Sequence, residues 1–135
     1  MRLKPVLRIV LAAAMVFAGV MHFVATDLYV AIMPSYLPLH LELVYVSGVF
    51  EILGGLGLLI RRTRRAAAWG LVLLYIGVFP ANLNMAIYEI QPSGGNIPPV
   101  LMWVRLPFQL LFIAWAWWMT RPDPVDAPIA SRQRP

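Results

Sequence analysis

Four apolar stretches, each about as long as a membrane-spanning helix, constrain the fold of this chain more than any other feature. They cover about residues 5–24, 43–60, 66–88 and 100–120, and a helix needs about 20 residues to cross the hydrocarbon layer. Of the 135 residues, 61% are hydrophobic and only 13% are charged, and a chain of this size cannot bury so much apolar surface inside itself. The sequence therefore predicts an all-α fold, an integral membrane four-helix bundle formed by residues 1–121.

The lysines and arginines predict how this bundle is oriented. Ten of the eleven lie before or at the very start of the first stretch, between the second and third stretches, or after the fourth. Because such residues favour the cytoplasmic side in short loops, we expect both termini and the segment RRTRR in the cytoplasm. The first stretch is expected to be retained as a span and not cleaved as a signal peptide. Residues 122–135 are polar and rich in proline, which predicts a disordered cytoplasmic tail.

A carboxylate lies in the middle of the second stretch, in the segment YVSGVFEILGGLGLLI. It belongs to Glu51, and with about 100° between successive side chains it shares one helix face with Ser47, Gly48, Gly54 and Gly55. Small residues mark the faces on which membrane helices approach each other closely. We therefore expect the Glu51 carboxylate to point into the bundle and not toward lipid.

The other three stretches each carry at least one polar side chain, and counting along the helices places all of them in the middle or outer half of the membrane. The predicted ligand-binding set is His22, Glu51, Asn82, Arg105 and Gln109. A charge at this depth costs at least ~2.5–3.5 kcal/mol on insertion scales, so such groups are functional candidates. Arg105 is the expected counter-charge of Glu51 and would keep it ionised, whereas an unpaired carboxyl would be neutral.

Structural roles for the same residues stay open at this point. A Glu51–Arg105 pair can act only as a fastening between helices, and His22 can be an ordinary hydrogen bonder between helices. Asn82 follows Pro80 by two residues and can repair the backbone where the proline removes a hydrogen bond. The outer segment of residues 25–42, broken by two prolines, is either a lid over the bundle or a plain connector.

Several kinds of chemistry are excluded or disfavoured by the residues present. The chain has no cysteine, which removes disulfide exchange, Cys-ligated zinc and iron–sulfur clusters. Haem is disfavoured because the second histidine, His40, lies in the outer segment, and His22 with Glu51 offers too few ligands for a metal. No histidine is placed to activate a nucleophile, and the basic residues follow membrane topology and not a nucleic-acid surface. We expect no independent catalytic activity.

Several segments of the chain resemble the DoxX family of bacterial four-helix membrane proteins. They are GVMHFVATDLY, PSYLP, VSGVFEILGGLGLL, AAAWGLVLLYIGVFPANLNMA and RLPFQLLFIAWAWW, and the resemblance extends over roughly residues 8 to 121. It implies a four-helix bundle in the bacterial cytoplasmic (inner) membrane and a link to membrane redox chemistry, because the family is named after a subunit of a thiosulfate:quinone oxidoreductase. The positions that match the family are His22, Glu51, Pro80, Asn82, Arg105 and Gln109.

Three functions follow as hypotheses. The first is an accessory or binding subunit of a membrane redox complex, which holds a quinone-type ligand in the polar pocket, since quinone carbonyls accept hydrogen bonds and a carboxylate can accept a quinol proton. The second is a small proton-coupled transporter that acts as a homodimer. The third is a purely structural subunit, which contacts its partners and the lipid bilayer through faces of small residues.

Overall fold

The computed structural model describes residues 3–91 and 95–123. Within these ranges the chain is helical and contains no strand. The helices are α1 (Leu3–Val24), α2 (Thr26–Ala31), α3 (His40–Leu59), α4 (Arg64–Ile87) and α5 (Pro99–Met119). The four long helices are each long and apolar enough to cross a membrane, as the hydropathy of the sequence predicts.

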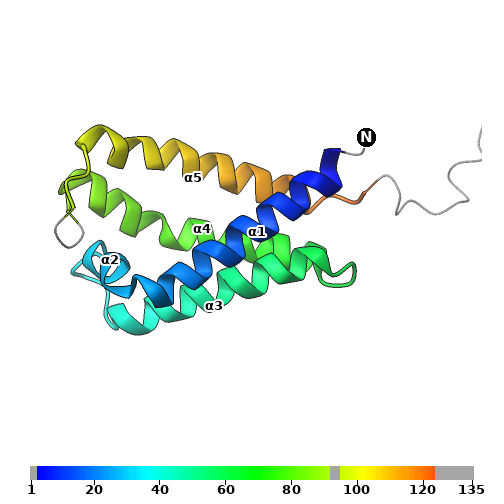
Figure 1. Cartoon of the computed structure of the whole chain (residues 1–135), viewed down its shortest axis with the longest axis horizontal. Coiled ribbons are helices and arrows are strands. Elements are labelled where there is room, and N and C mark those ends of the chain that lie inside the picture. The colour runs from blue at the N-terminus through cyan, green and yellow to red at the C-terminus, as the bar shows by residue number, and fades with distance from the viewer. Residues whose placement is uncertain (1–2, 92–94, 124–135) are drawn as a thin grey trace, which may run out of the picture.

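The four long helices run up and down in chain order, joined by short connections (Figure 1). One end of the bundle carries the start of α1, the turn between α3 and α4 and the end of α5, whereas α2 lies at the other end (Figure 1). Helix α1 packs along α3, α3 along α4, and α4 along α5, while α1 and α5 share few contacts. The bundle is therefore closed on three sides by packed helix pairs.

Most of the outward surface of the bundle is apolar. Large side chains such as Phe17, Leu53 and Leu73 are more than half exposed, although they lie in the middle of long helices. A contiguous apolar surface of this kind marks contact with a membrane or with another protein. It is the arrangement that a lipid-covered bundle requires, since only a narrow strip of each helix can be buried against its neighbours.

Two apolar clusters form the interior. The larger one lies toward the end that carries the start of α1, and it is built from Leu11, Ala12, Met15, Leu58, Ala68, Leu71, Val72, Tyr75, Ala116 and Met119. The smaller one lies toward α2 and contains Ile32, Met85, Ala86 and Met102. The interior is thus divided along its length, and the polar side chains described below lie between the two clusters.

The chain beyond α5 folds back onto the start of α1. The Asp123 carboxylate lies 2.5 Å from Nη2 of Arg8, 3.1 Å from Nζ of Lys4 and 3.1 Å from Nη1 of Arg64. Lys4 also donates a hydrogen bond of 2.6 Å to the carbonyl of Arg121. Asp123 therefore joins α1, α4 and the end of α5. Of the tail expected over residues 122–135, the part from residue 124 onward lies outside the described residues.

Candidate functional site

The site begins with a close crossing of α1 and α3. A Cβ atom added to Gly19 would lie 2.6 Å from the Gly48 carbonyl oxygen, and one added to Gly48 would lie 2.7 Å from Cβ of His22. Both distances are shorter than any normal carbon contact, so only glycine fits at these two positions. The crossing confirms the prediction that small residues beside Glu51 mark a tight helix interface.

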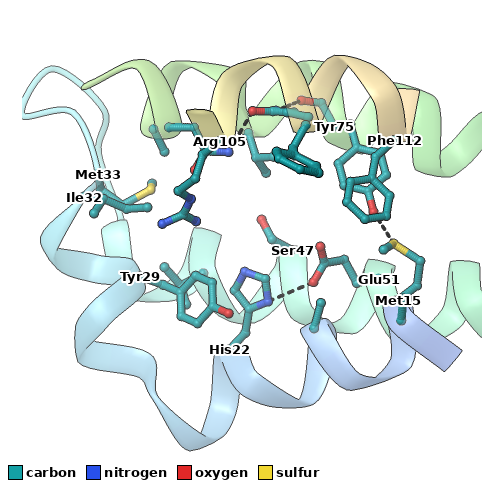
Figure 2. Close-up of a pocket in the computed structure, with 18 of the residues that line it drawn as sticks. Met15, His22, Tyr29, Ile32, Met33, Ser47, Glu51, Tyr75, Arg105 and Phe112 are labelled. Atoms are coloured by element: carbon teal, nitrogen blue, oxygen red, sulfur yellow. Dashed lines mark hydrogen bonds and ion pairs between the residues drawn. The ribbon is translucent and has the colours of Figure 1, made fainter. Parts of the chain in front are cut away.

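This crossing brings His22 against Glu51. Nδ1 of His22 lies 3.0 Å from Oε2 of Glu51, and the two residues are only 8% and 7% exposed. The two side chains point toward each other across the inner faces of α1 and α3 (Figure 2). The ring N–H is poorly aligned with the carboxylate oxygen, so the contact has the distance of an ion pair without the geometry of a good hydrogen bond.

The predicted pairing of Glu51 with Arg105 is wrong in this structure. None of the ion pairs formed within residues 3–91 and 95–123 joins these two side chains. Arg105 instead donates a hydrogen bond of 3.2 Å to the sulfur of Met85, and its guanidinium projects from α5 into the space above Tyr29 (Figure 2). His22 takes the place beside the carboxylate because the glycine crossing brings α1, and not α5, closest to Glu51.

A second polar group links α4 to α5. Nδ2 of Asn82 donates to Oε1 of Gln109 at 2.8 Å, and Nε2 of Gln109 donates to the carbonyl oxygen of Tyr75 at 2.6 Å. Asn82 therefore does not repair the backbone after Pro80. The Tyr75 carbonyl lies in the helical turn before Pro80, and it accepts its hydrogen bond from Gln109 of the neighbouring helix α5.

Helix α2 covers the end of the site that is opposite the start of α1 (Figure 1). The Tyr29 ring lies against the His22 ring, with 3.9 Å between centroids, and Nδ2 of Asn84 donates to the carbonyl of Ile32 at 3.1 Å. Burial and the nearby Glu51 raise the pKa of the Tyr29 hydroxyl above its ordinary value, while Arg105 acts in the opposite direction. The hydroxyl therefore stays protonated near neutral pH. Whether the outer segment acts as a lid or as a plain connector stays a prediction.

All five predicted site residues line one cavity of about 570 Å³, which lies within the size range of small-molecule sites. Its walls are mostly apolar, and the cavity lies between the two interior clusters. Figure 2 shows polar side chains from α1, α3 and α5 facing the same space. Further lining residues are Met15, Tyr29, Ile32, Met33, Ser47, Tyr75 and Phe112. A role for any of them in binding stays a prediction.

The sequence interpretation did not place Tyr29 or Tyr75 in the cavity wall. Tyr75 is buried at the end of the cavity nearer the start of α1, where its hydroxyl contacts the sulfur of Met15. The sequence contained one weak indication of this position. Tyr75 precedes Asn82 by seven residues, so the two residues share one helix face. Tyr29 had no comparable signal, because the helix is interrupted at Ala25 between it and His22.

The arrangement can bind a ring compound that offers hydrogen-bond acceptors. Imidazole, guanidinium and amide groups supply donors, the Glu51 carboxylate supplies an acceptor, and Tyr29 and Phe112 supply flat apolar surfaces. Within the described parts of the chain, no three His, Asp or Glu side chains lie close enough together to hold a metal ion. The polar groups come from four helices, so the pocket depends on the assembled bundle.

Comparison with known proteins gives one match. Residues 11–120 match the model of a protein family described as "Domain of unknown function (DUF8561)". The match begins within α1 and ends just beyond α5, and it includes all five predicted site residues. No curated protein and no solved structure matches the chain.

Proposed function

The chain belongs to the DUF8561 family, and we propose that it is a multi-pass membrane protein that binds a quinone-type ring in its polar pocket. In this proposal it is an accessory or binding subunit of a membrane redox system and carries no catalytic activity of its own. The observation that carries the proposal is the convergence of a buried His22–Glu51 pair with Arg105 and Gln109 on one largely apolar cavity. The resemblance to the DoxX family supports the same assignment by analogy.

The chemistry of the pocket suits both redox states of such a ring. A quinone carbonyl accepts hydrogen bonds, for which Arg105 and Gln109 each retain N–H groups beyond those used in the contacts described above. A quinol hydroxyl donates, and the Glu51 carboxylate is the acceptor beside it. His22 lies 3.0 Å from that carboxylate, so a proton received by Glu51 has a neighbouring base to share it.

We further propose a location in the bacterial cytoplasmic membrane with both chain ends in the cytoplasm. The distribution of Lys and Arg supports this orientation, because the basic segment of residues 61–65 lies at the same end of the bundle as the start of α1 and the end of α5 (Figure 1). The pocket then lies in the middle and outer half of the membrane. A ligand dissolved in the lipid would reach it directly.

A proton-coupled transporter that acts as a homodimer is the second candidate. A permanent positive charge beside Glu51 would oppose this function, because it would hold the carboxylate ionised and repel cations. Among the described residues, however, Arg105 forms no ion pair with Glu51. The carboxylate contacts His22 instead, and a histidine can change its charge during a transport cycle.

Mass spectrometry of organic extracts tests the proposed function. Wild type, Glu51→Gln and Glu42→Gln are purified in native-lipid discs, and Glu42 is the matched control because it lies on α3 but does not line the cavity. We expect a quinone enriched in wild type and Glu42→Gln and lost from Glu51→Gln. Identical lipid extracts from all three proteins would contradict the proposal and favour a structural subunit.

A further inference from the structure

The cavity is not enclosed, although three sides of the bundle are closed by the packed pairs α1–α3, α3–α4 and α4–α5. Residues of α2 cover one end of the cavity. The larger apolar cluster closes the opposite end, toward the start of α1, where Tyr75 contacts Met15. The remaining side is the one between α1 and α5, which share few contacts.

The course of the two helices agrees with an opening on this side (Figure 1). Helix α1 meets α5 near the start of α1 and the end of α5, and the two helices diverge toward α2 (Figure 1). At the crossing end, the Lys4 ammonium lies 5.7 Å from the centroid of the Trp118 ring, and Asp123 ties Lys4 and Arg8 to the chain that follows α5. These contacts hold the two helices together at that end.

Apolar residues of both helices line the cavity, and Arg105 of α5 lines it with them. The apolar residues include Ala14 and Ala18 of α1 and Leu101 and Phe108 of α5. The two alanines fill little space, and Leu101 and Phe108 are 52% and 55% exposed although they also line the cavity. Because all four lie within helices that can cross a membrane, the proposed membrane location would surround this opening with hydrocarbon and not water.

We propose that the ligand enters between α1 and α5 from within the membrane and carries a long hydrocarbon tail that lies in this opening. The inference rests on the proposed function. It adds the hydrocarbon tail of the ligand and the path by which the ligand enters the cavity. The polar ring occupies the space among His22, Glu51 and Gln109, while the tail passes between Ala18 and Phe108 into the lipid. Entry from water would instead lead past α2, where Tyr29 and Ile32 cover the cavity.

Photolabelling tests the route directly. The probe is a dimethoxy-methyl-benzoquinone with a decyl tail that carries a diazirine, reconstituted with wild-type protein in lipid discs. We expect labels on Ala14, Ala18, Leu101 or Phe108 that an excess of unlabelled decyl quinone removes. Competed labels on α2 would overturn the route and leave the proposed function intact. Labels that no excess of quinone removes, spread equally over the lipid-facing side of α3, would show that the ring does not bind, and would overturn both.

A pair of tryptophan variants gives a second test. Ala18→Trp fills the opening, whereas Ala13→Trp places the same side chain on the exposed face of α1, away from the cavity. We expect Ala18→Trp to bind the decyl quinone about tenfold more weakly, the size of effect that overfilling a packed space produces, and to weaken binding of the tail-free quinone by less than that. Equal decyl-quinone binding by both variants would overturn the route. Loss of tail-free binding in Ala18→Trp alone would also overturn it, because residue 18 would then belong to the ring site.

Discussion

Gly48 of α3 lies so close to His22 of α1 that a Cβ atom added to the glycine would be 2.7 Å from Cβ of the histidine. The absence of that one carbon lets the two helices approach, and their approach places the imidazole beside the Glu51 carboxylate. The polar centre of the pocket therefore depends on a position that has no side chain. This dependence makes the helix crossing testable apart from any ligand.

Gly48→Ala should destabilise the protein by about 1–3 kcal/mol, the usual cost of overpacking, because the new methyl group meets backbone and Cβ atoms that cannot move aside. Gly70→Ala is the matched control, since a Cβ atom at Gly70 of α4 meets nothing within 4 Å. That control should be neutral or stabilising by up to about 1 kcal/mol, because alanine favours the helix over glycine. Thermal unfolding in detergent measures both, and equal effects of the two substitutions would contradict a tight crossing.

The contact between His22 and Glu51 should appear as an energetic coupling. Glu51→Gln and His22→Gln, made singly and together, should show a coupling of about 0.5–3 kcal/mol in the free energy of unfolding, as residues in direct contact do. Glu42→Gln combined with His22→Gln is the control pair and should be additive to within about 0.5 kcal/mol. Additive effects for the Glu51 pair would show that the two side chains do not interact.

Gln109 should be coupled to Asn82 in the same way. Gln109→Leu removes the acceptor for Asn82 and the donor for the Tyr75 carbonyl, so we expect a loss of about 1 kcal/mol, in line with hydrogen bonds measured between membrane helices. Asn82→Ala added to that variant should cost little more, because its partner is already gone. If Asn82→Ala costs the same in both backgrounds, the hydrogen bond between the two side chains is absent.

Asp123 should stabilise the bundle in a way that depends on pH and salt. Burial alone would raise the pKa of the Asp123 carboxyl, but hydrogen bonds from Arg8 and Lys4 outweigh it and hold the pKa below its ordinary value of 3.8. A carboxyl whose pKa is lowered by folding contributes stability above its unfolded pKa, and this contribution is lost as the pH falls through the folded pKa. The contribution should therefore be constant near neutral pH and should fade below about pH 3.8.

The variant that tests this contribution is Asp123→Asn, beside Asp27→Asn as a control at an exposed aspartate of α2. We expect Asp123→Asn to lower the free energy of unfolding by about 1 kcal/mol at pH 7, less at high salt, because the ion pairs are only partly shielded from water. The difference from wild type should shrink under acid. A difference that persists unchanged at acid pH, or that also appears for Asp27→Asn, would contradict the assigned ion pairs.

The positions of the long helices could be predicted closely from the sequence, and the reason is physical. The predicted bounds differ from the observed ones by three residues at most, for example 43–60 against His40–Leu59. Hydropathy alone determines these segments, because a spanning helix must be apolar over its whole length. Helical periodicity likewise placed the five polar side chains on inward faces, and the structure brings all five to one cavity.

The pairing of the polar side chains could not be predicted in the same way. Periodicity gives the direction of a side chain around its own helix, but it does not say which helix lies opposite. That choice depends on the contact between Gly19 and Gly48, which brings α1 and not α5 against Glu51. The position of Tyr29 was equally hidden, because α2 returns over the bundle only after the break at Ala25.

The most direct test of the central claim is a titration with a tail-free dimethoxy-methyl-benzoquinone that carries ¹³C at its carbonyls. Wild type, Glu51→Gln and Glu42→Gln are compared in lipid discs by carbonyl chemical shift. We predict saturable binding with a shifted carbonyl signal in wild type and Glu42→Gln, and loss of that signal in Glu51→Gln. A linear, unshifted uptake that is identical in all three proteins would mean that the ring only dissolves in the lipid, and it would contradict the claim that the pocket around Glu51 is a quinone site.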